Sequence, residues 1–172
     1  MINVIDSWIT ANIQLVFAAC FIGPLAALLL FNLGVVHDRQ QERCLPWAWY
    51  FKNGFVMPQK GEYAMLDGNF VRSHYEQNQY FKKTFIGKQL VASAGDVVEV
   101  NSEGIFVNDE LMASGLPLAQ KFYQVDEHQF YKTYLLEEGE YFFLGTHPLS
   151  NDSRYFGPVH TNAILAKITP LI

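Results

Sequence analysis

The 172-residue chain contains little cysteine and no cluster of basic residues. Its two cysteines, Cys20 and Cys44, are too few for a disulfide framework. Because Cys20 lies within a long apolar stretch that Cys44 could hardly reach, we expect Cys44 to be a lone thiol. The 12 Lys and Arg residues are scattered and outnumbered by 17 Asp and Glu residues, so nucleic acid is not an expected partner. The five histidines show no metal-ligand spacing, and we expect no metal or other cofactor.

Charged residues are absent between Ser7 and His37. Within this stretch, Ile13 to Val36 is apolar except for Gln14 and Asn32. A helix of about 20 apolar residues crosses the hydrocarbon core of a bilayer, so the stretch is long enough to span it. No Lys or Arg precedes it, whereas a cleaved signal peptide begins with a basic segment. We therefore predict a retained membrane anchor in residues 1–37 and one working domain in residues 38–172.

The domain after the anchor is predicted to be mainly β. Val97–Val100 and Ile105–Val107 flank a four-residue loop that contains glycine, which is typical of a β-hairpin. Short strands with such turns indicate an antiparallel sandwich or barrel, and residues 117–134 give no clear pattern. The other predicted strands are Tyr50–Met57, Glu62–Leu66, Gln89–Ala92, Tyr141–Leu144 and Ala163–Ile168.

Several segments occur in the order found in a known peptidase family. Ser150–Val159 reads Ser-x-Asp-Ser-Arg-Tyr-Phe-Gly-Pro-Val and resembles the last conserved box of type I signal peptidases, the peptidase S26 family. Lys88–Asp96 is similar to the lysine box of that family. Arg43–Tyr50 is similar to the nucleophile box of its conjugative-transfer, TraF-type branch, and Pro58–Tyr63 is similar to the stretch that follows it. Together with the anchor, these segments span nearly the whole chain.

The resemblance implies a signal-peptidase-like antiparallel β domain with a catalytic pair. Cys44 stands where the family has its nucleophilic serine, and Lys88 stands where it has its general base. Ser150 matches the serine that orients the lysine, and Asp152 and Arg154 match a nearby acidic and basic pair, for which we favour a bracing role.

The function implied is membrane-bound endoproteolysis. The expected substrate is an exported, membrane-inserted precursor, specifically a conjugative pilin, and cyclisation of the pilin is an extension of the same acyl-enzyme chemistry. The expected location is the bacterial inner membrane, in a single pass, with the domain in the periplasm. Charge indicates the opposite orientation, because Arg39 and Arg43 follow the apolar stretch and no basic residue precedes it.

The Cys44 and Lys88 pair has two possible modes of action. A lysine must be neutral to accept a proton, although its pKa is ordinarily about 10.4. An apolar setting is therefore needed to lower the pKa. Phe85, Ile86, Leu90 and Val91 could provide that setting. The pKa of a cysteine thiol is ordinarily about 8.5. If Lys88 is charged, its ammonium would stabilise a Cys44 thiolate, so Lys88 could also act as a charge partner.

Two features of the sequence depart from the family pattern. Glu42 stands where a hydroxyl often serves the oxyanion hole, and Gly145–Leu149 differs from the usual first half of the last box. A degenerate scaffold for pilus or transfer-complex assembly is therefore the main alternative to an enzyme. A thiol redox protein is a further alternative, although it would lack a second cysteine in the domain.

Single residues also have simpler interpretations. Cys44 could be an inert buried residue, and Lys88 could be a solvated lysine at a strand end. A pairing of Cys44 with His147 is also conceivable. The aromatic run at Trp47, Trp49, Tyr50 and Phe51 could form core or a surface that enters the lipid.

Overall fold

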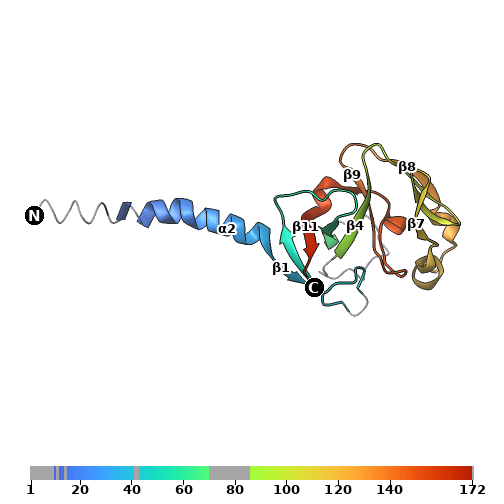
Figure 1. The fold of residues 1–172 in the computed structure, drawn as a ribbon, viewed down its shortest axis with the longest axis horizontal. Coiled ribbons are helices and arrows are strands. Elements are labelled where there is room, and N and C mark those ends of the chain that lie inside the picture. Colours follow the sequence, from blue (N-terminus) through green and yellow to red (C-terminus); the bar gives the residue numbers. More distant parts are fainter. Residues whose placement is uncertain (1–9, 11, 14, 41–42, 70–85, 172) are drawn as a thin grey trace, which may run out of the picture.

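An apolar helical segment leads into a β domain. The structure is a computed structural model, and it describes residues 10, 12–13, 15–40, 43–69 and 86–171. Figure 1 shows the helical segment projecting away from the domain. It contains a π-helical turn, η1 (Ala18–Ile22), and the helix α2 (Gly23–Asn32), and no residue of either is buried.

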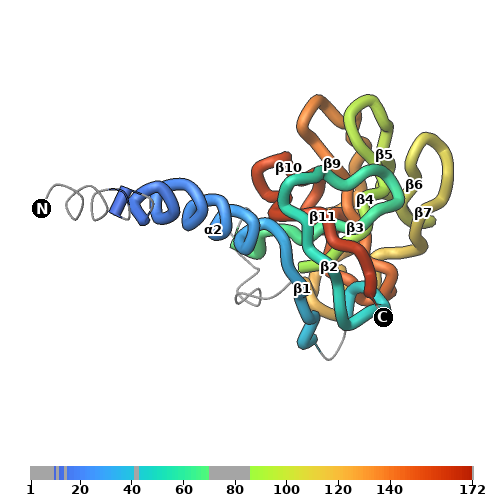
Figure 2. Tube along the Cα trace, turned by 60° about the vertical axis from the view of Figure 1, so that its left-hand side comes forward, coloured from blue at the N-terminus to red at the C-terminus, as the bar shows by residue number. Residues whose placement is uncertain are grey.

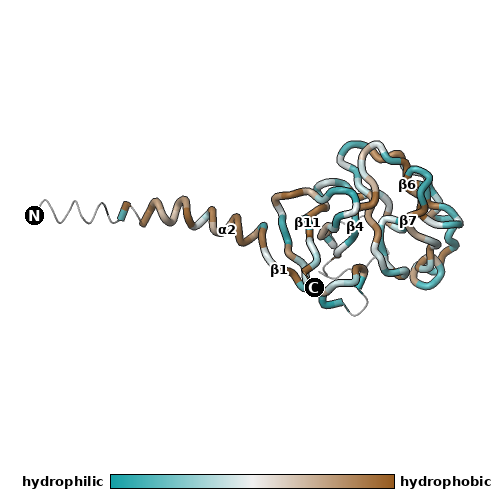
Figure 3. Tube along the Cα trace, viewed as in Figure 1, coloured by the Kyte–Doolittle hydropathy of each residue, from teal (hydrophilic) through white to brown (hydrophobic). Residues whose placement is uncertain are grey.

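The helical segment has the length and composition of a membrane span. Residues Leu15–Asn32 have a mean hydropathy of 2.2 over 18 residues, and none of this window is buried within the protein. A helix of that length rises by about 27 Å, close to the thickness of a hydrocarbon core of about 30 Å. Figure 3 shows the apolar character along most of the segment.

The helix ends at Asn32, five residues earlier than the end of the predicted anchor. Leu33–His37 forms the strand β1, which pairs antiparallel with β2 (Trp49–Asn53). At the helix end, Lys52 Nζ donates to the Phe31 carbonyl at 2.6 Å, and the Gly54 N–H donates to the Asn32 carbonyl at 2.8 Å. A cation is favourable at a helix C-terminus, where the carbonyls lack helical partners. The apolar stretch therefore divides between anchor and sheet, which its hydropathy alone did not indicate.

The larger sheet has seven strands in the order β1-β2-β11-β3-β4-β9-β10, and all neighbouring strands are antiparallel. Figure 2 shows α2 running directly into β1, with β2 and β11 nearby. The other strands of this sheet are β3 (Tyr63–Leu66), β4 (Ile86–Ser93), β9 (Glu140–Leu144), β10 (Val159–His160) and β11 (Ile164–Pro170).

The smaller sheet has four antiparallel strands in the order β7-β6-β5-β8. Its strands are β5 (Val97–Val100), β6 (Gly104–Val107), β7 (Glu110–Ser114) and β8 (Lys132–Leu135). The short helices η2 (Ala119–Tyr123) and η3 (Glu127–Phe130) lie between β7 and β8 along the chain.

The predicted mainly β fold is confirmed. The predicted hairpin is β5 and β6, with Val100 opposite Ile105, and each of the other predicted strands overlaps an observed one. The prediction missed β1, β7, β8 and β10. β1 continues an apolar helix in sequence, and β10 has only two residues, too few for a periodic pattern.

Strand β4 contributes to two hydrophobic cores. Val91 and Ala92 belong to the core that also includes residues of β5 and β6, whereas Ile86 and Leu90 belong to a smaller core with Phe143. Burial on both faces makes β4 a central strand, on which a polar side chain would be removed from water.

Candidate active site

Lys88 is buried in the middle of β4. Its exposed fraction is 1%, and it lies directly across from Ala64 of β3. Side chains alternate along a strand, so Lys88 shares a face with Ile86 and Leu90, whose side chains belong to the smaller core. Lys88 forms no hydrogen bond or ion pair with a residue in the described part of the chain. The interpretation of a solvated lysine is therefore wrong. Of its expected apolar neighbours, Ile86 and Leu90 share its face of β4, Val91 belongs to the other core, and Phe85 lies outside the described residues.

Gly145 directly follows β9 and lies against Ser150. The last residue of β9, Leu144, is paired with Gln89, the residue after Lys88 on β4. A Cβ atom added to Gly145 would lie 2.0 Å from Ser150 Oγ. Ser150 is 1% exposed, and its hydroxyl has no hydrogen-bond partner in the described structure. A buried hydroxyl without a hydrogen bond lowers the stability of the fold, so its presence requires an explanation, and a role in the site is one.

The loop that carries Cys44 is attached to the same segment. The Cys44 carbonyl accepts hydrogen bonds from the N–H groups of Thr146 at 2.9 Å and His147 at 3.3 Å, and from Thr146 Oγ1 at 3.2 Å. The same carbonyl oxygen would lie 3.1 Å from a Cβ on Gly145. Cys44 is half-buried, while the next residue, Leu45, is buried in a core. Cys44 and Ser150 thus both border Gly145, the residue that follows β9.

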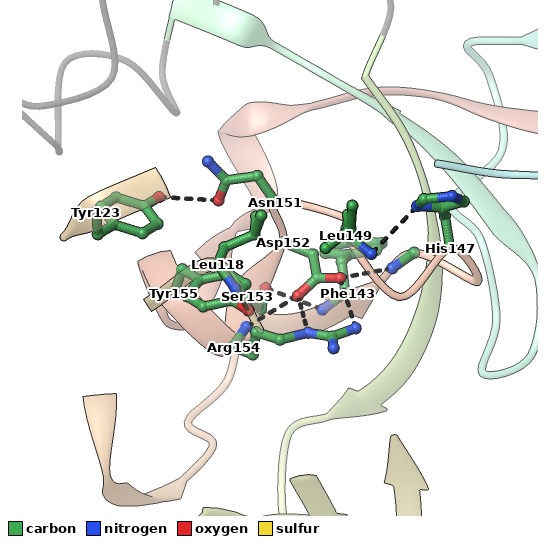
Figure 4. Close-up of polar contacts among 11 residues, drawn as sticks. Leu118, Tyr123, Phe143, His147, Leu149, Asn151, Asp152, Ser153, Arg154 and Tyr155 are labelled. Atoms are coloured by element: carbon green, nitrogen blue, oxygen red, sulfur yellow. Dashed lines mark hydrogen bonds and ion pairs between the residues drawn. The ribbon is translucent and has the colours of Figure 1, made fainter. Parts of the chain in front are cut away.

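Asp152 and Arg154 form a buried pair that holds the Ser150 loop (Figure 4). Arg154 Nε donates to Asp152 Oδ1 at 2.7 Å, and Arg154 Nη2 donates to Asp152 Oδ2 at 3.0 Å. Asp152 Oδ2 also accepts the Gly145 N–H at 2.9 Å. The exposed fractions of Asp152 and Arg154 are 0% and 3%. These contacts agree with a bracing role, because they tie the loop before Arg154 to the residue that follows β9.

The rest of the last box connects this loop to its surroundings. Ser153 Oγ accepts the Phe143 N–H at 3.0 Å, which attaches the short helix α4 (Ser153–Phe156) to β9. The Tyr155 hydroxyl accepts the Leu118 N–H at 3.0 Å, and burial raises the pKa of Tyr155 to about 12. The box therefore has a structural function as well as carrying Ser150.

The lysine box and the Pro58–Tyr63 stretch are joined through Asp96. This carboxylate accepts the Ser93 N–H and the Asn108 side-chain amide, each at 2.8 Å, and pairs with Lys60 at 3.0 Å. Burial acts to raise the pKa of Asp96, but these hydrogen bonds and the Lys60 charge outweigh it and lower the pKa. Asp96 thus stabilises the turn after β4.

His147 uses its ring within its own turn. Its Nδ1 accepts the Leu149 N–H at 3.1 Å (Figure 4), and its backbone N–H donates to Cys44. Nothing in the described structure joins the ring itself to the Cys44 sulfur through a hydrogen bond. The contact between the two residues is therefore made by the backbone.

Asp38 lies at the base of the loop that carries Cys44 and is not part of any of the motifs. Asp38 is 2% exposed, its N–H donates to the Ala48 carbonyl at 2.8 Å, and its Oδ1 accepts the Gln40 N–H at 3.0 Å. Arg43 Nε is buried and has no hydrogen-bond partner in the described structure. The available signal was an acid just after the apolar stretch, a type of residue that contributes little to the positive-inside rule. Glu42 lies outside the described residues.

A family model, described as signal peptidase, peptidase S26, matches residues 52–172. The chain belongs to this family. Membership supports a peptidase function, and the family acts on exported precursor proteins at the membrane. The matched region contains Lys88 and Ser150, whereas Cys44 precedes it.

The chain is also similar in fold to a solved signal peptidase. The crystal structure of a signal peptidase I from Enterococcus faecalis V583 is 24% identical, with a TM-score of 0.40, over 66% of this chain and 98% of that chain. No curated protein matches the chain. The fold itself is mainly antiparallel β, with one apolar helix before it.

Proposed function

We propose that this protein is a membrane-anchored endopeptidase in which Cys44 and Lys88 form the reactive pair. The observation that carries the proposal is the convergence at Gly145. Within the described residues, the buried Lys88 precedes Gln89, which pairs with the residue before Gly145; the Ser150 hydroxyl lies against Gly145 without a partner, and the Cys44 carbonyl is held beside it. An inert cysteine and a lysine in water would need no such arrangement.

The arrangement supports acyl transfer through a thioester. Lys88 takes the proton of the Cys44 thiol, the sulfur attacks the carbonyl carbon of the scissile peptide bond, and the carbon–nitrogen bond breaks as the leaving amine takes that proton from Lys88. Water then gives a proton to Lys88 and attacks the thioester; the acid is released, and Lys88 returns the proton to the Cys44 sulfur. Ser150 would orient the lysine amine through a hydrogen bond between its hydroxyl and the amine, a role for which its buried hydroxyl is free of other partners in the described structure.

The substrate and location are proposed from the sequence resemblance. The Cys44 box and its neighbouring segments favour the conjugative TraF-type branch, so the proposed substrate is a pilin precursor at the inner membrane, with the domain in the periplasm. Attack of an amine on the thioester, in place of water, would join the pilin ends. The helix that ends at Asn32 would hold the site near the membrane, where such a precursor is inserted.

The test is mass spectrometry of the pilin precursor from cells that contain the wild-type protein or a variant. We expect a shortened pilin, or one lighter by a further water if its ends are joined, with the wild type. Cys44→Ala and Lys88→Ala should leave the precursor intact, while Cys20→Ser, which changes the other cysteine, should process it normally. Processing by Cys44→Ala would reject the proposed nucleophile.

Alkylation of Cys44 separates the enzyme from the alternatives. Fast alkylation that the precursor protects against supports an enzyme, whereas slow alkylation that ignores the precursor supports a scaffold. A mixed disulfide with a client protein would support a redox function instead. The Cys20→Ser background ensures that only one thiol reacts.

A further inference from the structure

A cavity lies beside the smaller sheet, between the end of β7 and the short helices η2 and η3. Its volume is about 630 Å³, within the range of about 300–1,000 Å³ that is usual for ligand sites. Residues 114–117, which continue from β7, form part of its lining together with residues 119–120 of η2. Residues 125–128, at the start of η3, form the rest. None of these residues belongs to the candidate active site.

The cavity combines an apolar lining with two adjacent carboxylates. Leu116 and Ala119, which are buried in the core that includes residues of β5 and β6, contribute to the apolar lining with the half-buried Val125. Asp126 and Glu127 contribute the carboxylates. In the part of the chain that the structure describes, no Lys or Arg lines the cavity. A ligand that carries a positive charge next to apolar groups therefore complements this lining.

Each carboxylate keeps one oxygen available to a ligand. Asp126 Oδ1 accepts the His128 N–H at 2.9 Å and pairs with the His128 ring, and Glu127 Oε1 accepts the Tyr131 hydroxyl at 2.6 Å. The second oxygen of each carboxylate has no hydrogen-bond partner among the described residues. The hydrogen bonds from the His128 N–H and ring lower the pKa of Asp126, so this carboxylate is charged at neutral pH.

The helix that lines the cavity also contacts the loop that carries Ser150 (Figure 4). Leu118, which lies between two lining residues, donates its N–H to the Tyr155 hydroxyl at 3.0 Å. Tyr123, the last residue of η2, donates its hydroxyl to Asn151 Oδ1 at 3.0 Å, and its ring stacks on that of Tyr155 with the centroids 5.5 Å apart. Helix η2 therefore contributes both to the cavity and to the support of the last box.

We propose that this cavity is an exosite, a second binding site that holds a segment of the precursor remote from the cleaved bond. The segment it fits is one in which a lysine or arginine adjoins apolar side chains, with the cation at Asp126 and Glu127 and the apolar groups against Leu116 and Val125. This inference rests on the proposed function and adds a chemical feature to its substrate. Binding of a remote segment raises affinity for the precursor without changing the reacting groups.

Direct binding tests the proposal without cleavage. The probe is a fluorescently labelled peptide in which lysine and leucine alternate, and its polarisation is measured with the full-length protein in phosphatidylcholine nanodiscs. Empty nanodiscs measure binding to lipid alone, which is subtracted. Two matched peptides replace every lysine with glutamate or every leucine with serine. We expect the peptide of lysine and leucine to bind most tightly, and equal affinity for the glutamate peptide would overturn the proposal.

Two variants test whether the peptide binds in the cavity. Asp126→Asn with Glu127→Gln removes both charges but keeps a cap for η3 and an acceptor for the Tyr131 hydroxyl. We expect it to weaken binding by about threefold or more, because an exposed ion pair contributes a modest amount singly. Gln120→Trp places an indole at an exposed lining position and should abolish binding. Wild-type affinity in both variants would overturn the proposal, and the comparison of peptides on the wild-type protein decides the matter even if a variant does not fold.

A matched control removes two adjacent carboxylates elsewhere. Glu137 and Glu138 are exposed between β8 and β9, and neither lines the cavity. Glu137→Gln with Glu138→Gln should therefore bind the peptide as the wild type does. In precursor cleavage, the two cavity variants should raise KM rather than lower kcat, because they remove binding that is uniform along the reaction. A fall in kcat with an unchanged KM would assign the cavity a structural role instead and overturn the exosite.

Failure of this inference is distinct from failure of the proposed function. Precursor cleavage that requires Cys44, without peptide binding at the cavity, would leave the peptidase intact and reject the exosite. Cleavage that survives Cys44→Ala would reject the peptidase mechanism. Peptide binding is measured in Cys44→Ala as well, because the cavity does not include Cys44, so the two results are obtained separately.

Discussion

Replacing Gly145 with alanine should displace Ser150 from its place in the site. The added Cβ would lie 2.0 Å from Ser150 Oγ and 2.5 Å from Ser150 Cβ, far closer than atoms in contact can approach. It would also lie 3.1 Å from the Cys44 carbonyl oxygen, which is fixed by hydrogen bonds to residues 146 and 147. Ser150 must therefore move, because the cysteine loop cannot easily do so.

The cost should appear in both stability and activity. Extra atoms in a packed interior typically cost about 1–3 kcal/mol, and Gly145 is buried and held by the Asp152 carboxylate, so we expect a loss in that range. A displacement of about 1 Å at a reactive group can lower activity by about 100-fold. The free energy of unfolding is measured by urea denaturation in detergent, and activity is measured by precursor cleavage.

A second substitution tests the cause of these losses. Ser150→Gly removes both atoms that the new methyl group would meet first, so Gly145→Ala with Ser150→Gly should regain most of the lost stability. Activity should stay low, because the Ser150 hydroxyl is gone. Ser150→Gly alone provides the reference for the missing hydroxyl. If Gly145→Ala folds with wild-type stability and cleaves the precursor at the normal rate, Ser150 does not lie against Gly145 as described.

Three further predictions address the Asp152–Arg154 pair, the turn after β4 and the aromatic side chains of β2. Asp152→Ala leaves the Arg154 guanidinium buried and unpaired, so urea denaturation should reveal a loss of about 3–5 kcal/mol; a loss below about 1 kcal/mol would contradict the brace. The pKa of Asp96 is lowered, so this residue stabilises the fold above its unfolded pKa and loses that effect as pH falls through the folded value. Asp96→Asn should therefore be less stable at neutral pH, and its melting temperature should fall less than that of the wild type below about pH 4. Trp49 is 46% exposed, whereas Trp47 packs against a core. If Trp49 enters the lipid, brominated lipids should quench the tryptophan fluorescence of a variant that keeps only Trp49 more than that of a variant that keeps only Trp47. Equal quenching would contradict this prediction.

The aromatic run illustrates what alternation can predict and what it leaves open. Tyr50 is fully buried, while Trp49 and Phe51 on either side are exposed. The sequence indicated an alternating strand, but it could not assign the two faces to core and surface. That assignment depends on the pairing of Tyr50 with Val36, and on a helix that ends early enough to release β1. The location of Trp49 relative to lipid stays a prediction.

The segments of the candidate site could be predicted because their residue patterns are local. Lys88–Asp96 and Ser150–Val159 each form one continuous piece of structure, and their internal contacts join residues close in sequence, such as Asp152 with Arg154. The burial of Lys88 was not readable from those patterns. It depends on β3 and β9, which flank β4 from distant parts of the chain.

The burial of Asp38 was not readable from sequence patterns for the same reason. In the sequence, the aspartate is only one acid among the arginines that follow the anchor. In the folded protein, its N–H donates to the Ala48 carbonyl, which closes the cysteine loop, and residues 146 and 147 donate to the Cys44 carbonyl, which attaches that loop to the segment after β9. These contacts join residues from distant parts of the chain, so only the folded structure brings the aspartate and the cysteine loop together.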